Sequence, residues 1–337
     1  MVALVFQADP SSGILMGNQK TTRRCEEIAM KVSQKVYEQR KQIAQDIAKS
    51  MKKDGLEWVK PFSDLQLPRN GVSGRQYNGR NIAHLFFVAK RRGYTDPRWF
   101  TWNQAKGKGY RVKKDSKSVL IEKWGQGSVK VGENDDGTEI FARIPVFQKA
   151  WNCFNAEQLE GIDEWSGRNV ELDDGQTVLV IERLLASSRC PVKEGGDEAY
   201  YSVNGDEIRI PSRHLYAHDG SASAFLRVLL HEMSHSTGKP LGRELKNKFG
   251  SAEYAYEELV AELSCLFTAS ALGFSLDFTD MGDEFSHRHV AYIQHWAQHI
   301  TDNPDVLFQT VGKASKASDM LLERYYRTPA VNAGANL

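Results

Sequence analysis

The amino-acid sequence predicts an α+β protein with two domains. Its 337 residues are about twice the roughly 150 residues of a typical domain. Residues 1–150 contain 28 Lys and Arg against 15 Asp and Glu, whereas residues 151–337 contain 16 against 28. The halves therefore carry net charges of +13 and −12, which indicates a nucleic-acid-binding part joined to a part of another kind. The predicted parts are a basic domain and an acidic domain with a flexible tail at each end: 1–25, 26–160, 161–326 and 327–337.

The composition excludes several classes of protein. Hydrophobic residues make up 41% and charged residues 26% of the chain, which is typical of a globular protein rather than a disordered or collagen-like one. No apolar run approaches the ~20 residues of a membrane span, and the N-terminus lacks the pattern of a secretory signal. The four cysteines stand far apart without a CxxC pair, which favours reduced thiols. We therefore expect a cytoplasmic protein without a membrane partner.

Mixed helix and strand patterns justify the assignment of the first domain. Apolar residues recur at helical spacing from about 33 to 53, and Gly55 is placed to end that helix. A second helix is predicted over 82–92, before a glycine. Two strands are predicted at 118–124 and 139–148, separated by the turn-forming sequence GENDDGT.

The second domain is predicted to open with a strand at 177–181 and a β-hairpin. The segments AYYSV and DEIRIP flank Asn204-Gly205, a pair that accepts the positive φ angles of a type I′ turn. Two long helices follow. The first contains LLHEMSHS and stops near Gly238, and the second covers 251–272 and ends before a glycine.

The first of these helices carries an HExxH sequence. An α-helix turns once every 3.6 residues, so His231 and His235 project from one face and can bind the same metal ion. Glu232 can direct its carboxylate at water on the metal and act as general base. We therefore predict a zinc site with His231 and His235 as ligands and Glu232 as the catalytic residue. The alternative is two ordinary helix histidines.

A third zinc ligand is expected from the next helix, because catalytic zinc usually takes three protein ligands and leaves a fourth position open. The helix at 251–272 carries Glu257, Glu258 and Glu262. We assign metal ligation to Glu258. Glu262 is assigned a hydrogen bond to a ligand histidine, since such a carboxylate fixes the tautomer and orientation of the imidazole. Glu262 and then Glu257 are the alternative ligands.

Other candidate residues lie on the same helix and further along the chain. His295 and His299 are also four residues apart, but no glutamate lies between them and the apolar residues around them indicate a packed helix. His287 and His289 lie just upstream. A donor is also needed for the oxyanion of a tetrahedral intermediate. Three tyrosines are candidates for it, and the sequence does not choose among them: Tyr254, Tyr256 and Tyr292.

The first domain has the composition of a single-stranded nucleic-acid binder. The segment KGKGYRVKKDSK holds six Lys and Arg in twelve residues, with tryptophans before and after it. Phosphates attract the cations, and unpaired bases stack on aromatic rings for ~1–3 kcal/mol each. The competing interpretation places the rings in the core and the charges on an ordinary solvated face. The predicted DNA-binding residues are Arg91, Arg92, Trp99, Trp102, Lys106, Lys108, Tyr110, Arg111, Lys113, Lys114 and Lys117.

Several spaced motifs resemble those of a known family. The segments PRNGVSGRQYNGRNIAHL, GYTDPRWFTWNQAKGKGYRVKKDSKSV and FNAEQLEG resemble the N-terminal domain of the ArdC antirestriction proteins of conjugative plasmids and phages. The segments LLHEMSHSTG, YAYEELVAELSCLF and YIQHWAQHI resemble the metallopeptidase-like domain that follows it. The resemblance implies an N-terminal domain that binds single-stranded DNA and a zincin-like C-terminal domain. It places the metal motif of the family on His231, Glu232 and His235, and its glutamate-bearing helix on Glu258.

We therefore expect an antirestriction protein that binds single-stranded DNA entering a recipient cell and carries a zinc-dependent peptidase. The exposed strand edge of the predicted hairpin can hold an extended peptide by main-chain hydrogen bonds. One alternative is a DNA-binding shield in which the metal is structural. Another is a protease that removes proteins crosslinked to DNA. The sequence does not identify the protein substrate.

Overall fold

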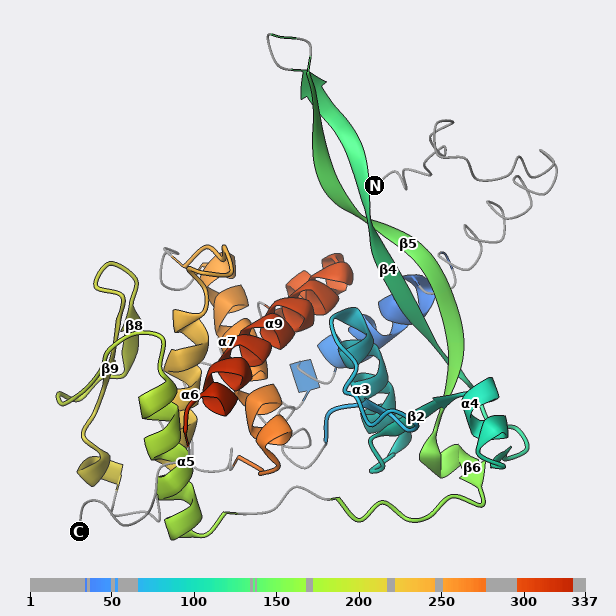
Figure 1. Cartoon of the computed structure of the whole chain (residues 1–337), viewed down its shortest axis with the longest axis horizontal. Helices are drawn as coiled ribbons and strands as arrows, with labels where there is room; N and C mark the ends of the chain where they lie inside the picture. Colours follow the sequence, from blue (N-terminus) through green and yellow to red (C-terminus); the bar gives the residue numbers. More distant parts are fainter. Residues whose placement is uncertain are drawn as a thin grey trace.

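The computed structural model of the chain confirms the predicted α+β class. It describes residues 34, 37–49, 52–53, 66–133, 136, 138–167, 172–216, 222–245, 251–276 and 296–329. Helices and strands are mixed along these residues. Figure 1 shows a half with a long β-ribbon beside a mainly helical half.

The N-terminal half is built on a four-stranded sheet in the order β1-β2-β5-β4. Its elements in chain order are β1 (Arg69–Asn70), α3 (Arg80–Arg92), β2 (Arg98–Thr101), α4 (Trp102–Gly107), β3 (Arg111–Val112), β4 (Val119–Glu133), β5 (Glu139–Asn155), the 3-10 turn Ala156–Gln158 and β6 (Leu159–Glu160). The two predicted strands are present and are longer than predicted. They pair as an antiparallel hairpin that projects well beyond the body (Figure 1).

The two predicted helices of this half are also present. Residues 37–49 are helical, within the predicted range. The helix α3 ends at Gly93, whose φ of 70° is the left-handed conformation that glycine adopts without strain. Eight consecutive residues of α3, from Ile82 to Ala89, are buried, so this helix lies in the core rather than on the surface.

The C-terminal half is a helical group with a small sheet at its outer side (Figure 1). Its elements are α5 (Asp174–Ser187), β7 (Val192–Glu194), β8 (Tyr200–Ser202), β9 (Glu207–Ile210), the 3-10 turn Arg213–Tyr216, α6 (Ala222–Ser236), α7 (Ala252–Leu272) and α9 (Asp305–Arg327). The helix α6 packs between α5 and α7, and α9 packs along α7. The sheet has the order β7-β9-β8, so β8 is an edge strand.

The prediction of a strand at 177–181 is wrong, because these residues lie within α5. Asp173 caps this helix by accepting a hydrogen bond from the backbone N–H of Gln176, and the Gln176 side-chain oxygen accepts one from the backbone N–H of Asp173. That capping box stabilises a helix start and outweighs the strand propensity of the run TVLVI. Thr177, Ile181 and Leu184 then face the core at helical spacing.

The predicted hairpin is present, but the predicted type I′ turn at Asn204-Gly205 is wrong. Ser202 pairs with Glu207, which leaves a four-residue loop, and the positive φ of 49° belongs to Asp206. The carboxylate of Asp206 accepts hydrogen bonds from Arg189 and, at 2.6 Å, from the hydroxyl of Tyr201. These side-chain bonds hold Asp206 in the left-handed conformation, which aspartate tolerates better than most residues.

The two halves share one continuous hydrophobic core. Leu85 and Phe86 of α3 belong to the same buried cluster as Phe267 of α7 and Phe308 of α9. Arg40 links the halves as well, because its guanidinium lies 3.0 Å from Glu122 of β4 and 3.3 Å from Asp305 of α9. The boundary predicted near residue 160 stays a prediction.

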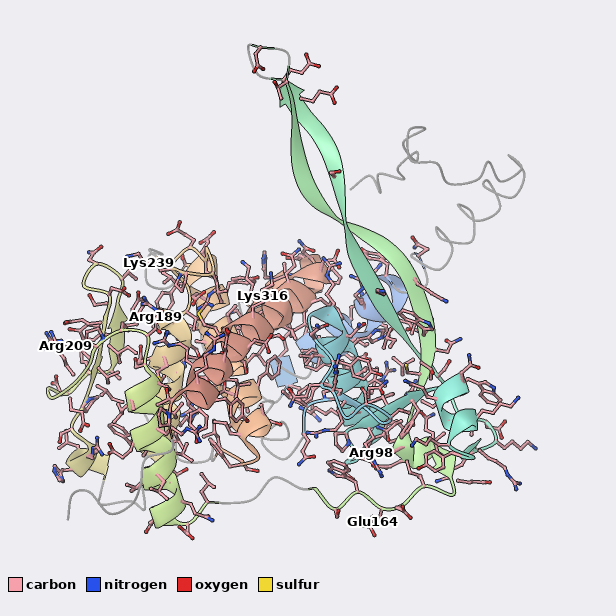
Figure 2. The ribbon with its side chains drawn as sticks, viewed as in Figure 1. Arg98, Glu164, Arg189, Arg209, Lys239 and Lys316 are labelled. Carbon is pink, nitrogen blue, oxygen red and sulfur yellow. The ribbon has the colours of Figure 1, made fainter. Side chains whose placement is uncertain are left out.

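The segment at 161–167 leads from one half toward the other beneath Arg98 (Figures 1 and 2). Arg98 and Arg69 each stack on the ring of Trp165 at 5.2 Å. The Trp165 indole N–H donates to Gln66 at 2.7 Å, and Arg98 donates to the carbonyl of Asp163 at 2.6 Å. This segment is therefore fixed to the N-terminal half.

None of the described helices combines the length and the apolar composition that a bilayer crossing demands. Cys153, Cys190 and Cys265 are buried free thiols. Cys25 lies outside the described residues, as do the predicted tail at 1–25 and residues 330–337.

Candidate functional site

The helix α6 carries the HExxH residues on a firmly packed scaffold. Phe225, Leu229 and Leu230 are fully buried, and Met233 is 2% exposed, so one face of α6 is locked into the core. His231 and His235 project beside this face toward α7. The helix α7 begins with Ser251 as N-cap and ends at Gly273, as its sequence predicts.

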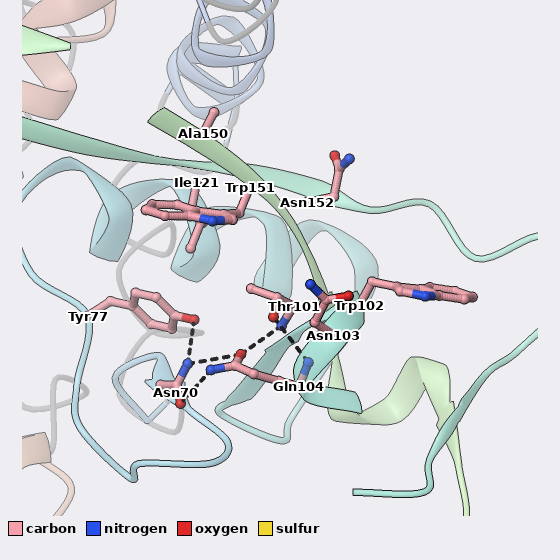
Figure 3. A pocket seen from close by; sticks show the side chains of 10 residues that line it. All are labelled: Asn70, Tyr77, Thr101, Trp102, Asn103, Gln104, Ile121, Ala150, Trp151 and Asn152. Atoms are coloured by element: carbon pink, nitrogen blue, oxygen red, sulfur yellow. Dashed lines mark hydrogen bonds between the residues drawn. The ribbon is translucent and has the colours of Figure 1, made fainter. Parts of the chain in front are cut away.

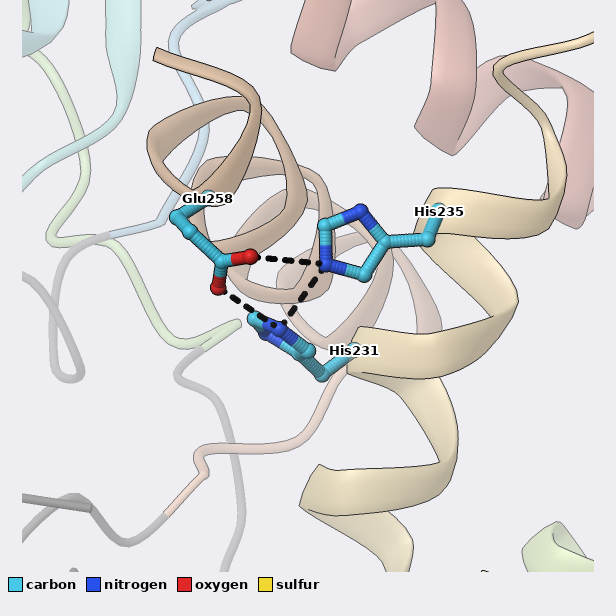
Figure 4. A group of neighbouring side chains, drawn as sticks. All are labelled: His231, His235 and Glu258. Atoms are coloured by element: carbon cyan, nitrogen blue, oxygen red, sulfur yellow. Dashed lines mark hydrogen bonds and ion pairs between the residues drawn. The ribbon is translucent and has the colours of Figure 1, made fainter. Parts of the chain in front are cut away.

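Three donor groups converge between α6 and α7 (Figure 4). The Nε2 atoms of His231 and His235 lie 3.1 Å apart. The two carboxylate oxygens of Glu258 lie 3.4 Å from Nε2 of His231 and 3.5 Å from Nε2 of His235. Ligands about 2.0–2.1 Å from one tetrahedral zinc ion are about 3.3 Å apart, so these residues fit a zinc ion.

A separate carboxylate contacts the other nitrogen of each imidazole. Glu262 Oε1 lies 3.1 Å from Nδ1 of His231, and Glu257 Oε1 lies 3.2 Å from Nδ1 of His235. Such contacts orient the ring and leave the lone pair of Nε2 for a metal. The sequence assigned this role to Glu262 only. Glu257 was considered only as a ligand, although it lies next to Glu258 on the same helix.

Two buried arginines in turn hold these carboxylates. Arg243 donates to Glu257 through Nε at 3.0 Å and Nη2 at 2.9 Å. Arg227 donates to Glu262 through Nη2 at 3.3 Å. Neither arginine was predicted from the sequence, because Arg243 lies in a loop and Arg227 looks like an ordinary residue of an amphipathic helix. Arg227 precedes His231 by four residues, so helical spacing places both on one face, and this spacing is the signal that could have identified Arg227.

The buried carboxylates attract positive charge to the position between the histidines. Burial alone would lower the pKa of His231, but Glu262 and Glu258 outweigh burial and raise this pKa well above its ordinary value. The pKa of His235 is also raised, because the charges of Glu258 and Glu257 outweigh burial. A cation bound at Nε2 would satisfy the same carboxylates, which supports the fit of the donor set to a metal.

Glu232 lies next to the donors and against the edge strand of the small sheet. Burial raises the pKa of Glu232 above its ordinary value. Helix α6 packs against β8, and the backbone of Tyr201 in this strand counteracts part of the rise in this pKa. The predicted general base therefore has the two histidines of α6 on one side and strand β8 on the other. In the described sheet, the outer edge of β8 is unpaired.

The competing candidates lie elsewhere or outside the described residues. Trp296, Ala297 and Ile300 are buried, so the helix predicted around them is packed, and His299 points outward as an exposed residue. Tyr254 lies one turn before Glu258 on α7, whereas the amine of Lys313 covers the ring of Tyr256 at 4.6 Å. The candidates outside the described residues are His287, His289, Tyr292 and His295.

The predicted DNA-binding cations all lie exposed on the N-terminal half. Arg92, Lys113, Lys114 and Lys117 line one cavity of about 360 Å³ at the end of α3. Arg91 pairs with Asp46 at 2.7 Å. The remaining three lie on or near α4 and β3: Lys106, Lys108 and Arg111. Four of the eight cations therefore share one cavity, and several already contact protein oxygens.

The aromatic candidates divide into buried and exposed residues. Trp102 is 56% exposed, and Tyr110 packs edge-on against Phe100 at 5.7 Å with part of its ring accessible. The prediction that Trp99 stacks on DNA is wrong, because Trp99 is fully buried. Strand β2 is interior to the sheet and is covered on both faces, since Trp99 and its neighbour Phe100 belong to two different core clusters.

Comparisons with known proteins agree with both halves of this description. Residues 37–154 match the N-terminal domain of anti-restriction factor ArdC, and residues 180–313 match a zincin-like metallopeptidase family. The crystal structure of antirestriction ArdC protein from the R388 plasmid in its metal-free form is 28% identical to the chain. It superposes with a TM-score of 0.64 over 86% of this chain and 98% of that one. The chain belongs to the ArdC family.

Other relatives of this ArdC-family chain extend the comparison. The Mn(II)-bound structure of the same R388 protein is 27% identical, with a TM-score of 0.63 over 85% of this chain and 97% of that one. Two Escherichia coli proteins named DNA primase TraC are each 28% identical over 83% of this chain, which spans only 27% and 19% of their lengths. The protein y4eC of Sinorhizobium fredii is 27% identical over 79% of this chain and 84% of its own length. The zincin-like domain implies a bound metal.

Proposed function

We propose that this ArdC-family chain is a zinc-dependent peptidase that binds single-stranded DNA and protects incoming DNA from restriction. The observation that carries the enzymatic part is the convergence of His231, His235 and Glu258, with Glu232 beside them. A purely structural metal would require no general base next to its ligands. The two carboxylates behind the imidazoles keep the histidines in one orientation.

The proposed mechanism assigns one task to each of these residues. His231, His235 and Glu258 would hold the zinc ion, which when bound supplies a Lewis acid for the scissile carbonyl and for water. Glu232 takes the proton of the attacking water on its carboxylate and passes it to the leaving amine. Its raised pKa makes the carboxylate a stronger base toward the attacking water.

The edge strand β8 is the proposed binding site of the peptide substrate. An extended chain can add to an open strand edge through main-chain hydrogen bonds, while its side chains enter neighbouring pockets. Helix α6, which carries Glu232, packs against β8, so a peptide on this edge would pass close to the general base.

The proposed binding site of DNA is the basic surface formed by the predicted cations of the N-terminal half: Arg91, Arg92, Lys106, Lys108, Arg111, Lys113, Lys114 and Lys117. The cations around α3, α4 and β3 are exposed, and four of them share one cavity. Exposed lysines and arginines bind phosphates by releasing counterions. The names of two relatives, antirestriction ArdC protein and DNA primase TraC, support a role on DNA.

The variant Glu232→Gln tests the enzymatic part. It keeps the size of the side chain and removes the base, so we expect metal content and DNA affinity to stay normal. Proteolysis should fall by about 10²–10⁴-fold, the usual contribution of general base catalysis. The measurement is antirestriction in recipient cells challenged with restricted DNA, together with elemental analysis. Glu323→Gln, an exposed substitution on α9, is the control.

Full antirestriction by Glu232→Gln would show that antirestriction does not need the peptidase and would favour the DNA-binding shield. If the variant also failed to cleave a protein crosslinked to single-stranded DNA that the wild-type chain cleaves, crosslink repair would be favoured instead.

A further inference from the structure

A cavity of about 580 Å³ lies in the N-terminal half, away from the candidate metal centre, beside α4, β2 and the base of the β4–β5 hairpin. Its volume lies within the roughly 300–1,000 Å³ of typical ligand pockets. Figure 3 shows aromatic rings and amides around it, and its lining contains no carboxylate, histidine, lysine or cysteine. Its lining therefore indicates binding.

Three aromatic side chains bound the cavity (Figure 3). Trp151 of β5 is half-buried and packs against the hydrophobic core, and so does Tyr77. Burial raises the pKa of Tyr77 above its ordinary value, so this hydroxyl stays neutral. Trp102 lies on the opposite side and is 56% exposed. Two rings are thus fixed by packing and one is accessible at the mouth.

A network of amides forms the polar side of the cavity. Asn70 Nδ2 donates to Gln104 Oε1 at 3.2 Å, and Gln104 Nε2 donates to Asn70 Oδ1 at 3.3 Å. Gln104 Oε1 also accepts from the backbone N–H of Thr101 at 2.9 Å. These bonds hold the amides in one orientation, so the polar atoms are in place before a ligand arrives.

Cations flank the aromatic rings. The Lys149 amine lies 5.5 Å over the ring of Trp151, and Lys106 follows Trp102 by one turn of α4. Asn152 lines this cavity and accepts a hydrogen bond from the Ser118 hydroxyl at 3.1 Å. Ser118 directly follows Lys117, which lines the basic cavity of about 360 Å³, so the two cavities are neighbours. A chain of phosphates passing along these cations would bring its bases to the aromatic cavity.

We propose that this cavity takes one unpaired base of single-stranded DNA, stacked against the exposed ring of Trp102 and meeting the amide side with its polar edge. The inference rests on the proposed DNA-binding function and names the position where the protein would tell single strands from duplex. A base in duplex DNA is already paired and stacked, so it cannot enter without being extruded. Stacking accepts any base, so the cavity would favour single strands without a strict sequence preference.

The experiment compares a short oligothymidylate with an abasic strand of the same length. Both strands present the same phosphates, but only the first has bases. We expect the full chain to bind the oligothymidylate roughly ten-fold more tightly, the size of one stacking contact. Trp102→Ala should remove most of this difference without weakening binding to the abasic strand, and Trp102→Phe should restore it. Tyr326→Ala, which removes an equally exposed ring from α9, is the matched control.

The outcomes separate this inference from the proposed function. Equal affinity of the wild-type chain for both strands would overturn the base site and leave DNA binding standing. Failure to bind either strand would overturn both. The fluorescence of 2-aminopurine placed within the strand should fall on binding to the wild-type chain and less so with Trp102→Ala. Free deoxynucleoside monophosphate that competes as well as the strand would overturn the assignment to DNA in favour of a nucleotide site.

Discussion

The candidate metal centre and the basic surface differ in how their charges are satisfied. His231, Glu258 and Glu262 are each less than 10% exposed, and the centre contains two histidines, three carboxylates and two arginines that contact one another. The predicted DNA-binding cations are all exposed, and some contact only a backbone carbonyl or a surface carboxylate. The first site is fixed before it meets a ligand, whereas the second is adaptable.

Solvation explains this difference. A charge withdrawn from water costs several kcal/mol unless a partner replaces the water, so each buried group at the metal centre requires its neighbours. An exposed lysine has no such requirement, and it gains binding energy when a phosphate displaces counterions. Substitutions at the metal centre should therefore act cooperatively, and substitutions on the surface should act in small, nearly additive steps.

The largest effect is expected from His231→Ala. Removing one ligand imidazole leaves the buried carboxylates without the cation that they attract, so we expect the bound metal, about one per chain, to be lost. Elemental analysis of the purified variant measures this. Single-stranded DNA binding should persist, because the basic surface lies in the other half.

His299→Ala is the control for that loss. It removes an imidazole from an exposed position on the packed helix and should leave the metal content unchanged. Undiminished metal content in His231→Ala would show that the buried cluster is not the metal centre. His295 and His299 would then be the next candidate ligands.

An intermediate effect is expected from Glu257→Gln. The amide keeps the size of the side chain but removes the charge that contacts His235 Nδ1 and Arg243. Loss of such an outer carboxylate typically weakens metal binding by 10–100-fold. Competition with a chelator measures the affinity, and Glu253→Gln, an exposed change on the same helix, is the control. Unchanged affinity would mean that Glu257 merely pairs with Arg243.

A smaller effect is expected from Lys113→Ala/Lys114→Ala. Each lost phosphate contact reduces the salt slope of single-strand binding by ~0.7, so the double variant should reduce it by ~1.4. Titrations at several salt concentrations give the slope. Lys239→Ala/Lys316→Ala removes two exposed cations from the other half (Figure 2) and should leave it unchanged. If both double variants had the same salt slope, Lys113 and Lys114 would not contact DNA phosphates.

Sequence reasoning succeeded where a short-range rule decides the structure. Helical spacing alone brings His231 and His235 together, and Ser251 and Gly273 mark the ends of α7. It failed where distant parts of the chain decide. The burial of Trp99 depends on two core clusters that meet across β2, and the conformation of Asp206 depends on Arg189. The contact of Glu257 with His235 depends on how α6 and α7 cross, which no local pattern encodes.

The smallest effect is expected from pH, at the junction of the two regions. His84 of α3 is 2% exposed and packs edge-on against Phe308 of α9 at 6.4 Å. Burial, helped by the charges of Arg40 and Arg92, lowers the pKa of His84 to about 3. Between this value and the ordinary value near 6.5, the unfolded chain binds a proton that the folded chain does not. The contribution of His84 to stability is therefore complete above pH 6.5 and is lost as the pH falls toward 3.

The variant His84→Leu isolates this contribution, because all other titrating groups are common to both proteins. The free energy of unfolding of the wild-type chain should fall more steeply with acid than that of the variant, by at most about 1.4 kcal/mol per pH unit. Urea unfolding at pH 6.5 and pH 5.5, followed by tryptophan fluorescence, measures the two slopes. Because His84 lies in the core that both halves share, the loss should affect both together. Equal slopes would show that His84 binds protons equally in the folded and unfolded chains, and separate transitions would show that the halves unfold independently.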